Sequence, residues 1–182
     1  MPKLYMVRHG KAAAAWGEDP DPGLDGTGHD QAKAVARGLA GMGPLLIVTS
    51  PLRRCRETAA PLAALWGIEP RILDAVREVP SPAPDFASRG EWLRGFLSRS
   101  WSEVEPSVLA WRQGLIAALC ALSEDSVVFT HFVPINVAVG AAQGTERVVN
   151  FRPDHCSVTV FQADRHALTL LSLGRDAETQ IR

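Results

Sequence analysis

Residues 3–10 read Lys-Leu-Tyr-Met-Val-Arg-His-Gly, an apolar run that ends in two basic side chains and a glycine. The run from Leu4 to Val7 has the length and composition of a short strand. In an open α/β sheet, ligands bind in the loops after the carboxyl ends of the strands. Arg8 and His9 should therefore lie at a functional site, where Gly10 lets the backbone come close to a ligand.

Strand-like and helix-like segments alternate along the rest of the chain. Further strands are predicted at residues 45–48, 71–73, 126–129, 148–151, 157–161 and 167–173, and helices at 31–39, 51–66, 91–97 and 106–122. Such alternation is typical of a mostly parallel sheet with helices on both faces. A short turn at residues 163–166 predicts one antiparallel edge. We expect an α/β fold with three layers, α/β/α.

The composition excludes several classes of protein. The chain has 182 residues, of which 46% are hydrophobic and 21% charged, with a net charge of −1. This length suits a single domain, residues 1–182. A net charge near zero argues against binding to nucleic acid or to an anionic membrane. The sequence has neither a membrane-spanning run nor a signal peptide, and its three cysteines are too scattered for a disulfide framework, so we expect a cytoplasmic protein.

The helix predicted after Ser50, with that serine as its N-cap, breaks a local electrostatic rule. Arg53, Arg54 and Arg56 crowd its first two turns, although a basic residue at a helix N-terminus costs about 0.3–1 kcal/mol. A bound anion would offset this cost, because backbone amides and guanidinium groups would then face negative charge. The alternative is a solvated basic face that is paired with Glu57.

The sequence has five histidines, each of which is a candidate for a functional role. His131 directly follows the strand predicted at residues 126–129, so it should reach the same edge of the sheet as His9. Two imidazoles beside several arginines indicate a site for an anion whose chemistry needs imidazole. His29, His155 and His166 are assigned structural roles instead.

Residues 79–84, Val-Pro-Ser-Pro-Ala-Pro, cannot form a regular helix or strand. They open a helical and proline-rich insertion that we place at residues 79–107. Four aromatic side chains lie in or near it, namely Trp92, Phe96, Trp101 and Trp111. One of them could stack on a substrate, but tryptophan at helical spacing is more often part of a core, which is the role we expect.

No metal site is predicted. Residues 19–25, Asp-Pro-Asp-Pro-Gly-Leu-Asp, superficially resemble a calcium loop but lack its acidic ligand before glycine and its final glutamate. The spacing of cysteine and histidine does not match a zinc site either.

Five segments together resemble the histidine phosphatase superfamily, the group that includes the phosphoglycerate mutases. They are Arg8-His9-Gly10, Leu24–Ala32 (Leu-Asp-Gly-Thr-Gly-His-Asp-Gln-Ala), Ser50–Ala59 (Ser-Pro-Leu-Arg-Arg-Cys-Arg-Glu-Thr-Ala), Thr130-His131 and Cys156–Val160 (Cys-Ser-Val-Thr-Val). The matches extend over nearly the whole chain, in the order that the family has them. The resemblance is to the phosphatases of this superfamily.

The resemblance implies a role for each matching residue. His9 would be the nucleophile that takes the phosphoryl group, while Arg8 and Arg54 would hold its oxygens and His131 would complete the pocket. Arg53 is the alternative to Arg54.

Glu78 is placed by the resemblance as the acid that protonates the leaving oxygen and later activates water. The short phosphohistidine phosphatases of this superfamily lack this acid, so membership of the superfamily does not by itself require Glu78 in the role. Glu91 and Glu18 are the alternatives. Phe132 stands where the family commonly has glycine after the second histidine.

The leading hypothesis is a metal-independent phosphoric monoester hydrolase of the histidine acid phosphatase type, working through phosphohistidine on His9 without a cofactor. Its substrate would be a small phosphorylated metabolite or a phosphoprotein. The alternatives are a phosphohistidine-protein phosphatase, a phosphoglycerate-type mutase and a non-catalytic phosphate-binding module. Residues 11–15, Lys-Ala-Ala-Ala-Ala, replace the mutase pattern and so disfavour a mutase.

Overall fold

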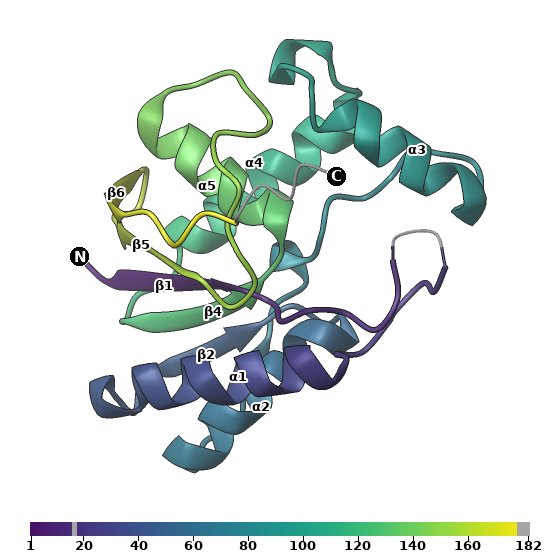
Figure 1. The fold of residues 1–182 in the computed structure, drawn as a ribbon. Coiled ribbons are helices and arrows are strands. Elements are labelled where there is room, and N and C mark those ends of the chain that lie inside the picture. Colours follow the sequence, from purple (N-terminus) through teal and green to yellow (C-terminus); the bar gives the residue numbers. More distant parts are fainter. Residues whose placement is uncertain (16–17, 178–182) are drawn as a thin grey trace.

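The computed structural model describes residues 1–15 and 18–177 and contains one six-stranded sheet (Figure 1). The strand order is β3-β2-β4-β1-β5-β6. The strands are β1 (Lys3–Arg8), β2 (Leu46–Thr49), β3 (Arg71–Ile72), β4 (Ser126–Thr130), β5 (Val158–Ala163) and β6 (Leu168–Ser172). The first four run parallel, whereas β5 is antiparallel to both β1 and β6. The predicted mixed sheet with an antiparallel edge is confirmed.

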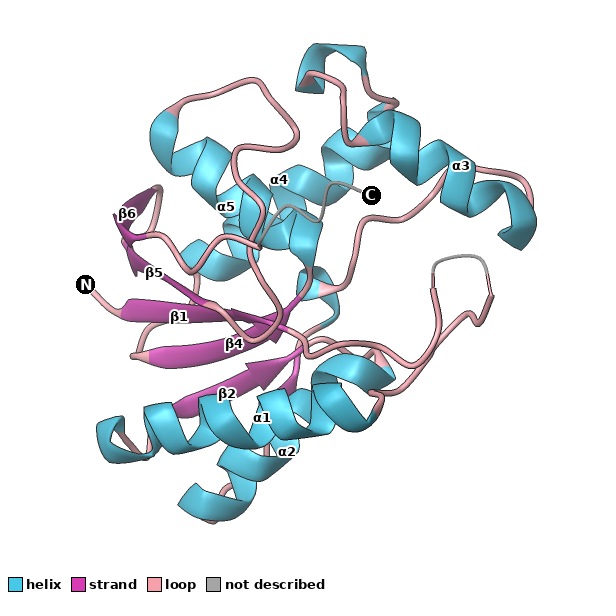
Figure 2. Cartoon of the chain, viewed as in Figure 1, coloured by secondary structure: helices cyan, strands magenta, loops and turns pink. Residues whose placement is uncertain are grey.

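Helices cover both faces of this sheet, as the three-layer prediction requires (Figure 2). They are α1 (Gly26–Leu39), α2 (Arg53–Trp66), α3 (Phe86–Phe96), α4 (Pro106–Cys120) and α5 (Phe132–Gln143), with short 3-10 helices η1 (Ala40–Met42), η2 (Asp74–Val76) and η3 (Trp101–Glu103). Helices α1 and α2 pack on one face, and α4 and α5 lie on the other. None of the helices within the described residues is long and apolar enough to cross a membrane.

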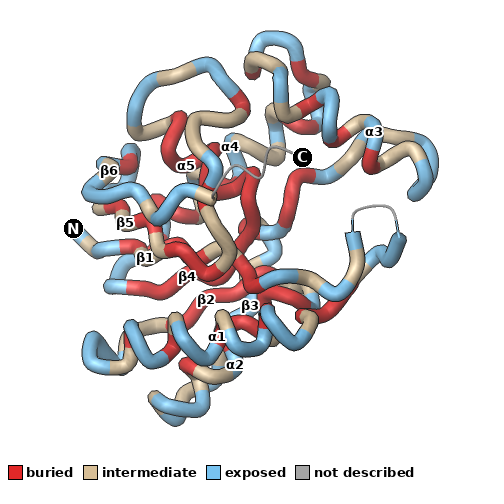
Figure 3. The backbone as a smooth tube through the Cα atoms, viewed as in Figure 1, coloured by how far each residue is buried: buried red, intermediate tan, exposed pale blue. Residues whose placement is uncertain are grey.

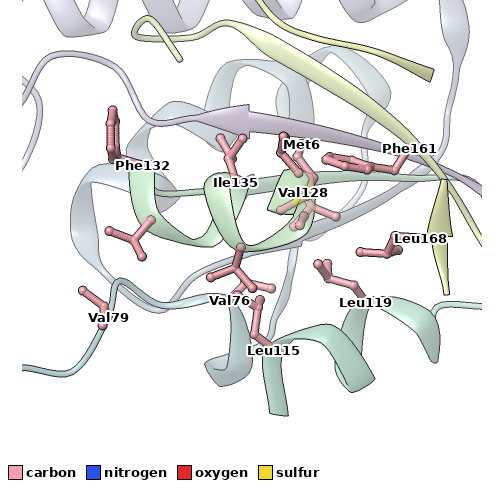
Figure 4. Close-up of a cluster of buried hydrophobic side chains, with 14 of the residues drawn as sticks. Met6, Val76, Val79, Leu115, Leu119, Val128, Phe132, Ile135, Phe161 and Leu168 are labelled. Atoms are coloured by element: carbon pink, nitrogen blue, oxygen red, sulfur yellow. The ribbon is translucent and has the colours of Figure 1, made fainter. Parts of the chain in front are cut away.

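The apolar core is divided by the sheet into two parts. The larger part lies between the sheet and α4 and α5, where Met6, Leu115 and Phe161 are fully buried (Figure 4). The smaller part lies under α1 and α2 and includes Val7 and Phe129. Figure 3 shows buried residues along β1, β2 and β4, and β4 is buried along its whole length. The site residues at the carboxyl ends of these strands are therefore attached to the most rigid part of the fold.

Helix α5 was not predicted, because its sequence has no helical periodicity. Every residue from Phe132 to Gly140 is buried, so apolar side chains occur all round the helix.

The strand predicted at residues 148–151 was wrong. Val148 packs in the core and its N–H donates to the Arg99 carbonyl at 3.1 Å, while the Asn150 N–H donates to Asn136 Oδ1 at 2.7 Å. These backbone N–H groups therefore find hydrogen-bond acceptors without a neighbouring strand.

The start of α2 also differs from the prediction. The helix begins at Arg53 with Leu52 as the N-cap, so Ser50 does not cap it. The Ser50 hydroxyl instead lies 2.9 Å from Nε2 of His131 and accepts a 3.3 Å bond from the Leu52 N–H.

The insertion at residues 79–107 forms an extended segment, then α3 and η3. Trp101 and Phe96 are buried in its core, and Trp92 stacks on Phe96 with ring centroids 4.8 Å apart. The core role that we expected is confirmed for these three side chains. The Trp101 N–H donates to the Glu146 carbonyl at 2.8 Å, which ties the insertion to the segment after α5.

Gly10 and Gly28 allow the first loop to pack directly on the start of α1. A Cβ at Gly10 would lie 2.7 Å from the Gly28 carbonyl oxygen, and a Cβ at Gly28 would collide with the Lys11 carbonyl. The Gly10 N–H donates to Thr58 Oγ1 at 3.0 Å, which anchors the loop to α2 as well. The close approach that Gly10 permits is therefore to the chain itself.

Replacing Gly28 by alanine should lower the free energy of unfolding by about 1–3 kcal/mol, because the backbone at Lys11 must move. Gly38 lies on the same helix with open space around it, so Gly38→Ala should instead raise that free energy by about 0.5–1 kcal/mol. Urea unfolding of both variants measures the difference. Equal stability of the two variants would contradict the close packing of this loop.

Candidate active site

The site lies where the carboxyl ends of β1, β2 and β4 meet. Strands β1 and β4 pair in parallel with Arg8 opposite Thr130, so the next residues, His9 and His131, leave the sheet side by side. Their ring centroids are 5.3 Å apart, and both side chains are buried. Arg54 reaches the same place from the first turn of α2, which follows β2.

The hydrogen bonds of His9 fix its tautomer. Its Nδ1 lies 2.7 Å from the Gly10 carbonyl oxygen, which can only accept, so Nδ1 carries the proton. Nε2 is then left with a lone pair, and it accepts a 3.2 Å bond from Nε of Arg54. The side chain thus presents an unprotonated ring nitrogen to a cationic group.

The guanidinium of Arg54 lies between the two imidazoles. Its Nη2 donates to Nδ1 of His131 at 3.1 Å. Because guanidinium has no acceptor, this nitrogen of His131 carries a lone pair, and Nε2 of the same ring donates to the Ser50 hydroxyl. Burial, and then the charge of Arg54, lower the pKa of both His9 and His131 well below the usual value of 6.5. Both rings are therefore neutral near pH 7.

Arg8 is held mainly by the backbone of the segment before β5. Its Nη1 donates to the Pro153 carbonyl at 2.8 Å, and the Phe132 ring lies 5.3 Å from its guanidinium carbon. Its Nε is buried and has no partner among the described residues. Phe132 therefore provides an aromatic face for this cation.

Glu78 is the buried carboxylic acid of this region. It follows η2, which Thr130 holds through a hydrogen bond from Oγ1 to the Val76 carbonyl at 2.6 Å. Burial raises the pKa of Glu78 above 4.5, against the opposing charges of Arg54 and Arg8. These two guanidinium groups form no ion pair within residues 1–15 and 18–177.

The alternative candidates for the arginine and for the acid lie away from His9 and His131. Arg53 is exposed, and its Nε donates to Glu57 Oε1 at 2.7 Å, so it points away from the histidines. Glu91 is exposed on α3. Glu18 is exposed in the first loop, where its Oε2 accepts from the Ala15 N–H at 3.0 Å.

A groove of about 660 Å³ opens beside Glu78, between the insertion and the rest of the chain. It is lined by Arg77, Phe86, Arg89 and Trp111, together with Pro80 and Pro84. Trp111 is half-buried and packs against the larger core, so its expected core role is only part of what it does.

His155, which was assigned a structural role, lies beside the site. Its ring centroid lies 6.0 Å from that of His9. The sequence did hold a signal for this position, because His155 comes shortly before β5, and an antiparallel neighbour of β1 begins where β1 ends. His29 and His166 lie away from the site: His29 Nε2 is 3.9 Å from Glu57, and His166 is exposed between β5 and β6.

The described part of the chain holds no group of three or more histidine, cysteine, aspartate or glutamate side chains placed to bind a metal ion. What the arrangement offers is an unprotonated imidazole nitrogen, one buried and one half-buried guanidinium group and a protonatable carboxyl. An anion would fit between them.

A sequence model of the histidine phosphatase superfamily (branch 1) matches residues 4–176. The chain belongs to this superfamily. His9, Arg54 and His131, the residues for which the resemblance implied a phosphate site, contact one another in the structure.

Individual curated proteins match over parts of their length. A glucosyl-3-phosphoglycerate phosphatase of Mycobacterium tuberculosis is 31% identical over 115 residues, 61% of this chain and 48% of that protein. PE-PGRS family protein PE_PGRS11 of the same organism is 44% identical over 82 residues, 42% of this chain and 14% of that protein. The chain thus spans less than half the length of the curated relatives it matches.

Solved structures of histidine phosphatases share the fold. A phosphoserine phosphatase of Entamoeba histolytica, in complex with phosphoserine, matches with a TM-score of 0.74 at 22% identity, over 94% of this chain and 96% of that one.

Replacing Arg54 by glutamine should raise the pKa of His9 towards its usual value, because a cation beside Nε2 is removed. The pKa stays below 6.5, since burial is the larger cause. Arg53→Gln is the matched control and should leave the pKa unchanged, because Arg53 is exposed. NMR titration of the histidine ring signals measures both. A shift of equal size in the two variants would mean that Arg54 does not lie against this ring.

Proposed function

We propose that this histidine phosphatase is a metal-independent phosphatase that hydrolyses phosphomonoesters through phosphohistidine on Nε2 of His9. The observation that carries the proposal is a buried, neutral His9 whose lone pair faces the guanidinium of Arg54. A nitrogen in this state can attack phosphorus, and the neighbouring cations stabilise the charge on the phosphoryl oxygens. The phosphatase names of several relatives support the same chemistry.

The first half-reaction forms the phosphoenzyme. The lone pair of His9 Nε2 attacks the phosphorus atom, and the bond from phosphorus to the leaving oxygen breaks. The protonated carboxyl of Glu78 gives its proton to that oxygen, so an alcohol leaves. The Gly10 carbonyl keeps its hydrogen bond from Nδ1 and stabilises the positive charge on the ring.

The second half-reaction restores the enzyme. Glu78, now a carboxylate, takes a proton from a water molecule, whose oxygen attacks phosphorus on the face opposite His9. The bond between nitrogen and phosphorus breaks, and inorganic phosphate leaves. Arg8, Arg54 and His131 hold the phosphoryl oxygens in both steps, once Arg54 exchanges its bond to Nε2 of His9 for bonds to the phosphoryl group.

We infer a small phosphorylated metabolite as the substrate. A groove of about 660 Å³ beside Glu78 has the size of a small-molecule pocket, and the leaving group would enter it. We treat residues 1–182 as one domain in which residues 79–107 act as a cap that selects the leaving group. Cytoplasmic location remains the prediction from composition.

The direct test is turnover of p-nitrophenyl phosphate in the presence of EDTA. Wild type should release p-nitrophenol, and His9→Ala should lose at least about 10³-fold in kcat because the covalent path is gone. His29→Ala is the control with an exposed histidine. Phosphate binding without any turnover by wild type would favour a non-catalytic binding module, whereas full turnover by folded His9→Ala would refute the nucleophile.

The pH dependence follows from the two shifted groups. His9 must be unprotonated, and its lowered pKa keeps it so down to acidic pH, so activity is lost only as pH falls below that value. Glu78 must be protonated, and its raised pKa extends that form above 4.5, so activity declines as pH rises through it. We expect a bell-shaped profile of kcat/KM with an acidic optimum, consistent with an acid phosphatase type.

Glu78→Gln should remove the alkaline limb of this profile and lower kcat/KM by about 10²–10⁴-fold for glycerol 3-phosphate. The loss should be smaller for p-nitrophenyl phosphate, whose leaving group needs no proton. Glu91→Gln, at an exposed position, is the control and should resemble wild type. Equal losses for both substrates would argue against Glu78 as the acid.

A further inference from the structure

A third imidazole, that of His155, lies beside the site and has no role in the mechanism proposed above. His155 is half-buried, and its ring lies 6.0 Å from that of His9 with an angle of 54° between the planes. Its backbone N–H donates to Asp154 Oδ1 at 2.8 Å. Within the described residues its ring nitrogens make no hydrogen bond, so they are available to a ligand.

The segment that carries His155 is fastened to Arg8, the neighbour of the nucleophile. The Pro153 carbonyl accepts from Arg8 Nη1 at 2.8 Å, and the Cys156 N–H donates to the Arg8 carbonyl at 2.9 Å. The Arg8 N–H donates in turn to the Ser157 carbonyl at 3.3 Å. These three bonds fix the position of the intervening histidine relative to His9.

The backbone at Cys156 is strained. Its φ is +56°, in the left-handed region that side chains other than glycine, asparagine and aspartate rarely adopt. Such a conformation is unfavourable and persists only where the surrounding contacts impose it. Here it turns the chain between His155 and the start of β5, so the strain lies directly beside the third imidazole.

The protonation state of His155 suits a hydrogen-bond donor. Burial, and then the charge of Arg8, lower its pKa to about 4, so the ring is neutral above that pH. A neutral imidazole has one N–H group to donate. A phosphoryl group needs several donors, and Arg8 already uses Nη1 on the Pro153 carbonyl.

We propose that His155 is a phosphoryl-binding residue, whose ring N–H donates to an equatorial oxygen of the phosphoryl group as it transfers to His9. This inference rests on the proposed function of His9. Attack in line places the leaving oxygen on the face of phosphorus opposite the nucleophile, towards Glu78. A ring beside His9 contacts the equatorial oxygens instead, so its contribution does not depend on the leaving group.

Three variants of His155 test the donor role. His155→Phe keeps a planar ring without an N–H, His155→Ala removes the ring, and His155→Asn restores a donor. We expect kcat/KM to fall about 10²-fold for Phe and Ala, the loss typical of one oxyanion donor, with partial recovery for Asn. The loss should be equal for p-nitrophenyl phosphate and glycerol 3-phosphate, and inhibition by orthovanadate should weaken by a similar factor. His166→Ala, at an exposed position, should match wild type.

Several outcomes would overturn the proposal. His155→Phe with the activity of wild type would show that no N–H is needed, and a loss confined to one substrate would place the contact on the leaving group. Thermal unfolding is measured in parallel, and if His155→Ala is unfolded, the comparison of Phe with Asn decides. Turnover by His9→Ala would defeat the proposed function itself, whereas inactive His9→Ala with unaffected His155 variants would defeat only this inference.

Discussion

The site depends on the two hydrogen bonds that the buried guanidinium of Arg54 donates to the imidazoles on either side of it. It donates to His9 on one side and to His131 on the other, so each ring must present a lone pair to it. Burial then keeps both rings neutral. Because neither Arg54 nor Arg8 has a carboxylate partner among the described residues, the pocket holds buried positive charge that an anion would compensate. One side chain thus sets both the charge of the pocket and the state of the nucleophile.

Arg8 links this pocket to the rest of the fold. Its backbone belongs to β1 and bonds to the segment before β5, while its side chain bonds to the Pro153 carbonyl and packs on Phe132. The segment before the antiparallel neighbour of β1 therefore lies beside the site, although the resemblance to the family implied no role for a residue of that segment. That connection brings His155 close to His9, across 146 residues of sequence.

The insertion contributes the wall that would face a leaving group. Its aromatic core and its bond from Trp101 to Glu146 fix it to the segment after α5. Glu78 and Trp111 both line the groove beside it. Under the proposed function, phosphoryl chemistry belongs to the strand ends and leaving-group selection to the insertion.

The sequence by itself determined the sheet strands that carry His9 and His131, because these follow from apolar runs that end in polar residues. The resemblance to the family favoured Arg54 over Arg53, and Glu78 over Glu91 and Glu18. Tertiary structure decided the rest. Helix α5 is apolar on all sides and shows no period, and residues 148–151 pack without a strand partner. His155 joins the site only through antiparallel pairing, and the raised pKa of Glu78 arises from burial. Pairing and burial depend on residues far apart in the chain, so no local pattern records them.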